Sequence, residues 1–132
     1  MYSKEQLEGI LISGAKCEIN VSRDLSASIG YRVRLRVNFR GKEEYLLAIG
    51  RTLKQHNIIA RFKKEEHKSR PRPILTVTGK AALYGLCNLV PDTIPHNNNW
   101  DIFKEARHIV HEVKGHQNSD GLDRILELKG LV

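Results

Sequence analysis

The stretch that decides the fold is Tyr31–Arg40, which reads Y-R-V-R-L-R-V-N-F-R. Its odd-numbered positions are apolar or aromatic, whereas its even-numbered positions are polar and mostly cationic. This period of two is typical of an extended strand with one buried face. Successive side chains of a strand point to opposite sides, so the pattern predicts a row of guanidiniums on one surface, from Arg32, Arg34, Arg36 and Arg40.

Two interpretations of this cationic strand are open. It is either the solvated outer face of a sheet or a surface that binds nucleic acid. Its ten residues contain no acid, and guanidiniums spaced along one strand repel each other unless water or an anionic partner lies between them. The flat fork of arginine also suits phosphates and base edges. We therefore favour the nucleic-acid surface.

The positive charge is concentrated in one part of the chain. The 132 residues include 22 Lys or Arg and 15 Asp or Glu, for a net charge of +7. Residues 31–80 hold 14 of the basic and 4 of the acidic residues, whereas the remainder holds 8 and 11. Such a distribution is expected of a surface that binds a polyanion. A membrane surface would also call for an amphipathic cationic helix, so we expect no membrane partner.

Length and cysteine usage bound the class of protein. A chain of 132 residues predicts one domain, spanning residues 1–132. Cys17 and Cys87 lie far apart without C-x-x-C spacing, which predicts reduced, buried thiols in an intracellular protein. The first residues lack the basic start and apolar run of a signal peptide, and no stretch is long enough to span a membrane.

The remaining elements follow from hydrophobic periodicity and from start and stop signals. Ser3 and Gln6 have capping-box spacing, while Gly14 and Asn57 are expected to end the first two helices and Asp120 to cap the last. The predicted helices cover residues 4–13, 43–56, 80–89, 100–113 and 120–129, and the further strands cover residues 16–22, 58–64 and 74–78. Residues 91–99 are expected to form an irregular connection.

The loop at residues 63–73 is the most cationic of the chain. It is either a mobile hairpin tip or a loop that grips a phosphate backbone, and the residues leave both open. The predicted nucleic-acid-binding residues are Lys16, Asn20, Arg32, Arg34, Arg36, Asn38, Arg40, Arg61, Lys63, Lys68, Arg70 and Arg72.

The histidines do not predict a metal site. His108 and His111 lie three apart with His116 beyond, whereas a zinc-binding H-E-x-x-H helix needs its histidines four apart. We interpret them as surface histidines and predict no metal ligand. No nucleophile elbow and no phosphate-loop glycine pattern occur in the sequence.

The segment Leu7–Ala15, L-E-G-I-L-I-S-G-A, followed by a strand, a loop and a second strand, resembles the motif of the LAGLIDADG homing endonucleases. Residues 43–47, 100–104 and 116–129 resemble the later segments of its single-motif members, so the resemblance covers nearly the whole chain. It implies an α+β fold, an αββαββα unit whose four-stranded antiparallel sheet forms a saddle on nucleic acid, with extra C-terminal helices. It also implies that the motif helices of two units pack together.

The chain departs from that family at the position of its chemistry. The resemblance implies an acidic residue at the end of the motif helix, where carboxylate oxygens hold a divalent cation beside the scissile phosphate. That position is Gly14, the often acidic position before it is Ile12, and the nearest acid downstream is Glu18. We interpret the catalytic site as lost and expect no catalytic residue and no cofactor. Glu8, in the helix seam, argues against a homodimer, because two facing carboxylates are costly to bury.

The predicted function is that of a non-catalytic nucleic-acid-binding protein. Structured RNA is the expected ligand, bound as an intron maturase binds it or within an organellar ribosome or other ribonucleoprotein particle, so a mitochondrion or another organelle is the expected location. The alternative is an active, homodimeric, Mg²⁺-dependent endonuclease that cleaves double-stranded DNA, with Glu18 or another residue as its carboxylate. A third hypothesis is a scaffold whose arginine strand meets an acidic protein.

Overall fold

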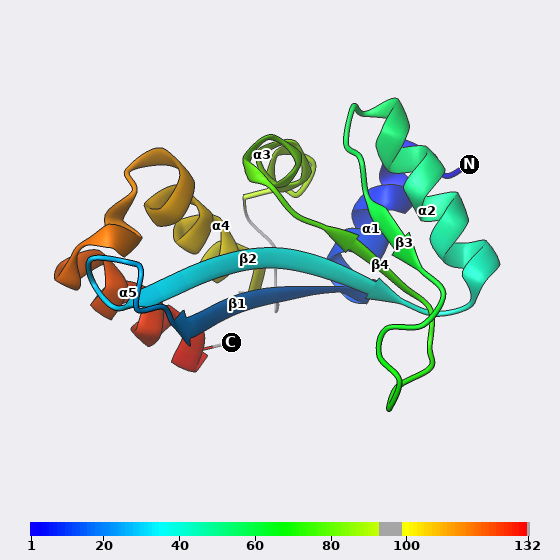
Figure 1. Cartoon of the computed structure of the whole chain (residues 1–132). Helices are drawn as coiled ribbons and strands as arrows, with labels where there is room; N and C mark the ends of the chain where they lie inside the picture. Colours follow the sequence, from blue (N-terminus) through cyan, green and yellow to red (C-terminus); the bar gives the residue numbers. More distant parts are fainter. Residues whose placement is uncertain (93–98, 132) are drawn as a thin grey trace. The chain divides into compact units, whose positions relative to one another are not determined.

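The structure is a computed structural model that describes residues 1–92 and 99–131 (Figure 1). It is an α+β fold in which the strands form one sheet in the order β1-β2-β4-β3, with β4 antiparallel to both of its neighbours. The order of elements confirms the expected αββαββα arrangement with further C-terminal helices. The elements are α1 (Lys4–Gly14), β1 (Ala15–Arg23), β2 (Tyr31–Arg40), α2 (Glu43–Gln55), β3 (Arg61–Lys63), β4 (Ile74–Val77), α3 (Lys80–Asn88), α4 (Asn99–Arg107), the π-helical turn η1 (His108–Glu112), the 3-10 turn η2 (Gly115–Gln117) and α5 (Ser119–Leu131).

The chain divides into two compact units. The first unit contains Met1–Lys16 and Arg36–Pro91, and the second contains Cys17–Leu35 and Asp92–Val132. Each unit is described separately below. The single domain expected over residues 1–132 stays a prediction, as does the saddle shape of the sheet.

In the first unit, α2 packs on β3 and β4, and Figure 1 shows this helix alongside the two strands. Leu46, Ile49 and Leu53 recur at helical spacing along α2 and are fully buried. The predicted capping box at the start of α1 is confirmed. The Ser3 side chain accepts a hydrogen bond from the Gln6 backbone N–H, and the Gln6 side chain accepts one from Ser3 N–H.

In the second unit, α4 and α5 pack on each other. Trp100 and Phe103 of α4 are buried, and their rings meet edge to face with centroids 6.0 Å apart. The Lys129 Nζ donates a 2.9 Å hydrogen bond to the carbonyl oxygen of Ile19 in β1. This bond ties the end of α5 to β1, which is an edge strand of the sheet.

Three elements differ from the predicted ones by more than one residue at an end. The third strand covers Arg61–Lys63 alone, because Ile58 N–H donates to Leu53 O and closes the end of α2 instead of joining a ladder. The last helix begins at Ser119 and its cap is Asn118, whose side chain accepts from the Gly121 N–H at 2.8 Å, and not Asp120. The helix expected over residues 100–113 changes from α4 to the π-helical turn η1 after Arg107.

Several other predictions are confirmed. Asn57 ends α2 with a positive φ of 62°, and Cys17 and Cys87 are buried and form no disulfide. Most of the irregular connection expected over residues 91–99 lies outside the described residues. Within residues 1–92 and 99–131, no helix is both long and apolar enough to cross a lipid bilayer.

Candidate nucleic-acid interface

The exposed face of β2 carries the arginines that the sequence predicts there. Arg32, Arg34 and Arg36 are exposed, whereas Val33 and Leu35 between them are buried. The strand alternates because each buried side chain contributes to the core while the next one points away from it. Guanidinium groups therefore stand at every second position of this part of β2.

The alternation ends at Asn38, where the prediction is wrong. Asn38 is only 1% exposed, and its Oδ1 accepts a 2.8 Å hydrogen bond from the Thr76 hydroxyl group. The two residues lie opposite each other in the β2–β4 ladder, which covers β2 from Val37 to Arg40. A buried amide that is satisfied by its cross-strand neighbour stabilises the sheet and is not available to a ligand.

The side chain of Arg32 in β2 is held by a carboxylate from the turn between β1 and β2. This turn covers residues 24–30 and is called the β1–β2 turn below. Arg32 donates from Nε at 3.0 Å, and its Nη2 lies 2.9 Å from the same oxygen, Asp24 Oδ2. The other oxygen, Oδ1, accepts from the Ser26 N–H at 3.0 Å and from the Ser26 hydroxyl group at 2.6 Å. These bonds from Ser26, together with the Arg32 guanidinium, hold the pKa of Asp24 below its usual value. The carboxylate is therefore ionised and fixed in place.

A second carboxylate holds Arg40. Arg40 donates from Nε to Glu66 Oε1 at 2.8 Å and from Nη2 to Glu66 Oε2 at 2.9 Å, which is the bidentate geometry of the strongest arginine–carboxylate pairs. The hydrogen bonds from Arg40 and the charges of Arg40, Arg70 and Arg72 lower the pKa of Glu66 to about 2. The pair anchors the β3–β4 loop (residues 64–73) to the end of β2.

The β3–β4 loop is an ordered hairpin extension. His67 and Arg70 form an antiparallel bridge, and Glu66 N–H donates to Arg72 O at 2.8 Å. Ser69 N–H donates to His67 Nδ1 at 3.2 Å. These bonds argue against the mobile hairpin tip, one of the two interpretations that the sequence leaves open, whereas the grip on a phosphate backbone stays a prediction.

The twelve predicted binding residues fall in both units, and apart from Asn38 all are exposed or half-buried. Asn20 and Arg40 are the half-buried ones. The first unit holds Lys16, Arg36, Asn38, Arg40, Arg61, Lys63, Lys68, Arg70 and Arg72. The second unit holds Asn20, Arg32 and Arg34.

The end of α1 offers no carboxylate at the position where the resemblance implies a metal ligand. Gly14 is exposed and Ile12 is half-buried, and neither has a side-chain oxygen. The Tyr45 hydroxyl lies 3.6 Å from the point where a side chain on Gly14 would begin, a neighbour that the sequence does not reveal. Burial, and to a smaller extent Tyr2, raises the pKa of Tyr45. In the part of the chain that the structure describes, no group of three or more His, Cys, Asp or Glu residues is placed to hold a metal ion.

The expectation of surface histidines holds for His108 alone. His108 is exposed, whereas His111 and His116 are half-buried, because η1 and η2 fold back toward each other in the second unit. Burial and the nearby Lys114 lower the pKa of His116. Its Nδ1 is buried and has no hydrogen-bond partner within the described residues.

The comparisons with known proteins point to one group of enzymes. No protein-family model and no curated protein matches the sequence. Among solved structures, the homing endonuclease I-TnaI superposes with a TM-score of 0.80 at 16% identity, over 97% of this chain and 86% of that chain. The LAGLIDADG homing endonuclease I-LtrWI, bound to target DNA, superposes with a TM-score of 0.82 at 19% identity, over 99% of this chain and 44% of that chain.

A third structure agrees with these two. The archaeal intron-encoded homing endonuclease I-Vdi141I, in complex with DNA, gives a TM-score of 0.79 at 20% identity, over 96% of this chain and 79% of that chain. The chain thus spans less than half of I-LtrWI but most of I-TnaI and I-Vdi141I. The similarity extends over nearly all of this chain in each case, and the chain therefore has the fold of the LAGLIDADG homing endonucleases.

Proposed function

We propose that this protein binds nucleic acid without cleaving it and prefers structured RNA to DNA. The observation that carries the proposal is the exposed row of Arg32, Arg34 and Arg36 on β2, in a fold that I-LtrWI and I-Vdi141I share in complex with DNA. Arginines at alternate strand positions match the repeated phosphates of a nucleic-acid backbone. The ordered β3–β4 loop adds the exposed cations Lys68, Arg70 and Arg72, and Lys63 lies next to the loop at the end of β3.

The absence of cleavage rests on Gly14. A carboxylate at the end of α1 would supply oxygen to a hard divalent cation, and glycine supplies none. Glu18, the nearest acid downstream, is half-buried on β1. Binding of the nucleic-acid backbone therefore needs only the cations, whereas its hydrolysis also needs metal ligands.

The preference for RNA follows from this separation. A protein that does not cut DNA gains nothing from a long DNA target, so the retained cationic surface is expected to serve a different ligand. A structured RNA in an intron, or in an organellar ribonucleoprotein particle such as a ribosome, presents the same phosphates. Proteins of that particle would then be further partners.

The function is tested by competition between matched ligands. A labelled RNA hairpin is bound to the protein and displaced by the unlabelled hairpin or by a DNA duplex of the same stem sequence. We expect the RNA to compete at lower concentration. Displacement by DNA at equal or lower concentration would contradict the RNA preference while leaving nucleic-acid binding in place.

The absence of cleavage needs its own assay. Both ligands are incubated with the protein and Mg²⁺ or Mn²⁺ and examined for strand breaks, with Glu18→Gln as the matched variant. We expect intact strands with either metal. Metal-dependent breaks that Glu18→Gln abolishes would instead establish the second candidate function, a Mg²⁺-dependent endonuclease.

That second candidate is favoured by the DNA in the I-LtrWI and I-Vdi141I structures. The chain spans 44% of I-LtrWI, so two copies of this chain would be needed to match its length. Glu8 in α1 is half-buried within its own chain, and a facing copy would bring a second carboxylate against it, at a cost in desolvation and repulsion. A monomer in solution at high concentration would count against this candidate.

A further inference from the structure

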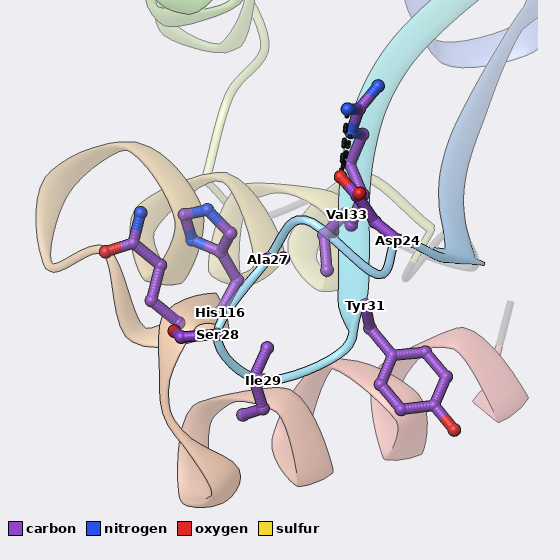
Figure 2. Close-up of a pocket in the computed structure, with 9 residues that line it drawn as sticks. Asp24, Ala27, Ser28, Ile29, Tyr31, Val33 and His116 are labelled. Atoms are coloured by element: carbon purple, nitrogen blue, oxygen red, sulfur yellow. Dashed lines mark hydrogen bonds and ion pairs between the residues drawn. The ribbon is translucent and has the colours of Figure 1, made fainter.

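The second unit contains a pocket at the β1–β2 turn, and one of its lining residues, Arg32, is also the first of the exposed arginines of β2. Its volume is about 360 Å³, and its walls come from the turn, the start of β2 and η2. Figure 2 shows Asp24, Ala27 and Ile29 on the turn, with His116 coming from a separate segment on the side away from Asp24. This pocket could not be predicted from the sequence, because η2 and the turn are about ninety residues apart.

Arg32 lines this pocket and retains free donors. Its Nε and Nη2 are engaged by Asp24, while Nη1 has no partner within the described residues. A guanidinium has five N–H donors in one plane, so the outer edge formed by Nη1 and Nη2 still presents two parallel donors. Two parallel donors match two adjacent acceptors, such as O6 and N7 of guanine.

The charge and the walls of the pocket favour a base over a phosphate. Asp24 neutralises Arg32, and the lowered pKa of His116 keeps that ring uncharged near neutral pH. Ala27, Ile29 and Val33 contribute apolar surface. A phosphate would lose its hydration there without gaining a net positive charge, whereas the flat face of a base is stabilised by contact with apolar side chains.

We propose that this pocket binds one unpaired guanine of the bound RNA, with the outer edge of Arg32 donating to O6 and N7 of the base. The proposal rests on the proposed RNA-binding function and adds the base that the protein reads. Asp24 acts as a positioning residue, because it fixes the plane of the Arg32 guanidinium. Adenine is rejected, since its N6 amino group would face the donors of Arg32.

The test uses single nucleotides, which do not depend on the rest of the interface. The full chain, labelled with ¹⁵N, is titrated with guanosine monophosphate, inosine monophosphate, adenosine monophosphate and 7-deazaguanosine monophosphate. We expect guanosine and inosine monophosphates to shift the resonances of residues 24–33, 116 and 117, and the other two, which lack one acceptor of the pair, to bind roughly tenfold more weakly. Equal shifts with all four would show a phosphate site and overturn the proposal, as would the absence of any shift.

Variants separate the guanidinium fork from its charge. Arg32→Lys keeps the charge but loses the planar fork, and should weaken the binding of guanosine monophosphate roughly tenfold. Arg51→Lys, a change of the same kind at an exposed position of α2 that does not line the pocket, should leave the affinity for this nucleotide unchanged. Melting temperatures equal to that of the unaltered protein show that both variants are folded, and equal weakening by both would contradict the assignment of Arg32.

Binding of polyuridylate distinguishes this proposal from the proposed function. This RNA contains no guanine, so its binding depends on the arginine face and the β3–β4 loop alone. Polyuridylate binding without selective guanosine monophosphate shifts would overturn the guanine site and leave RNA binding standing. Selective shifts without binding of polyuridylate or of the hairpin would support the pocket and overturn the proposed RNA function.

Discussion

The β1–β2 turn and the β3–β4 loop each hold one arginine of β2 with a carboxylate, but they place it in different surroundings. In the turn, Asp24 neutralises Arg32 next to a pocket with apolar walls. In the loop, Glu66 neutralises Arg40 while exposed Lys68 and further exposed cations remain around it. The same kind of ion pair, between an arginine and a carboxylate, therefore leaves a neutral pocket in one region and an excess of positive charge in the other.

The surroundings of a paired arginine determine how it can contribute to ligand binding. An excess of cations displaces counterions from a phosphate backbone, so the contribution of the β3–β4 loop to affinity should fall with salt. A guanidinium that is neutralised and held in one plane contributes oriented hydrogen-bond donors more than positive charge. The contribution of the β1–β2 turn to affinity should therefore depend on the identity of the base and only weakly on salt.

The largest effect is expected from removing the charge of the β3–β4 loop. The combined change Lys68→Ala, Arg70→Ala and Arg72→Ala should weaken RNA binding roughly a hundredfold at moderate salt, because about three phosphate contacts are lost. The slope of log K against log salt should become shallower by about 2 to 3. Binding isotherms over a range of salt concentrations measure both quantities.

The matched control removes equal charge from the outer side of α2. Lys42→Ala, Arg51→Ala and Lys54→Ala are changes at exposed positions of α2 and its N-cap, and they should leave the slope nearly unchanged. A similar loss in both triple variants would mean that affinity reflects net charge and not the β3–β4 loop.

Next in size is the effect of Gly121→Ala on the wall of the pocket. A side chain on Gly121 would overlap the carbonyl group of Gly115, which begins η2 and precedes His116. We expect a loss in the free energy of unfolding of about 1–3 kcal/mol, because the backbone must move to relieve the overlap. Chemical denaturation measures it.

Gly9→Ala provides the contrast. Nothing lies within 4 Å of a side chain added at Gly9 of α1, so alanine there should stabilise the helix by roughly 0.5–1 kcal/mol. Equal destabilisation by the two substitutions would show that the close approach of η2 and α5 does not govern the stability of the second unit.

An effect of similar size is expected from Asn38→Ala. Removing the amide leaves the Thr76 hydroxyl group without its partner in the β2–β4 ladder, and should lower the free energy of unfolding by about 1–3 kcal/mol. The salt slope of RNA binding should not change, because Asn38 is buried. An altered slope with unchanged stability would return Asn38 to the list of binding residues.

The smallest effect concerns the ion pair that anchors the β3–β4 loop. The pKa of Glu66 is lowered from 4.5 to about 2, so its pairing with Arg40 stabilises the loop fully above pH 4.5 and is lost as the pH falls toward 2. A carboxyl-detected NMR titration should give a midpoint near 2 for Glu66, and Arg40→Gln should raise that midpoint. A midpoint near 4.5 in the unaltered protein would contradict the bidentate pair.

The alternation of β2 and the capping box of α1 could be predicted because both depend on residues near each other in the chain. The burial of Asn38 could not, since it is caused by Thr76 in a strand 38 residues away. The pairing of Arg40 with Glu66 likewise joins residues 26 positions apart. By contrast, the Asp-x-Ser spacing of Asp24 and Ser26 is a local turn signal that could have identified the anchored carboxylate.

The candidate site shows the same division. The exposed arginines were found from period and charge alone, whereas the pocket required a turn and η2 to meet across most of the chain. The third strand is shorter than the sequence predicts. Ile58 is apolar enough for a strand, but its backbone N–H caps the end of α2 instead. Local patterns thus predicted the exposed arginines of β2, and tertiary contacts determined which polar side chains of the strand are paired or buried.

The measurement that tests the central claim most directly is the salt dependence of RNA binding by the double variant Arg34→Ala, Arg36→Ala. Both residues are exposed on β2, so we predict weaker binding and a slope that is shallower by about 1.5 than that of the unaltered protein. A slope identical to that of the unaltered protein would show that the arginine face of β2 does not contact the phosphate backbone.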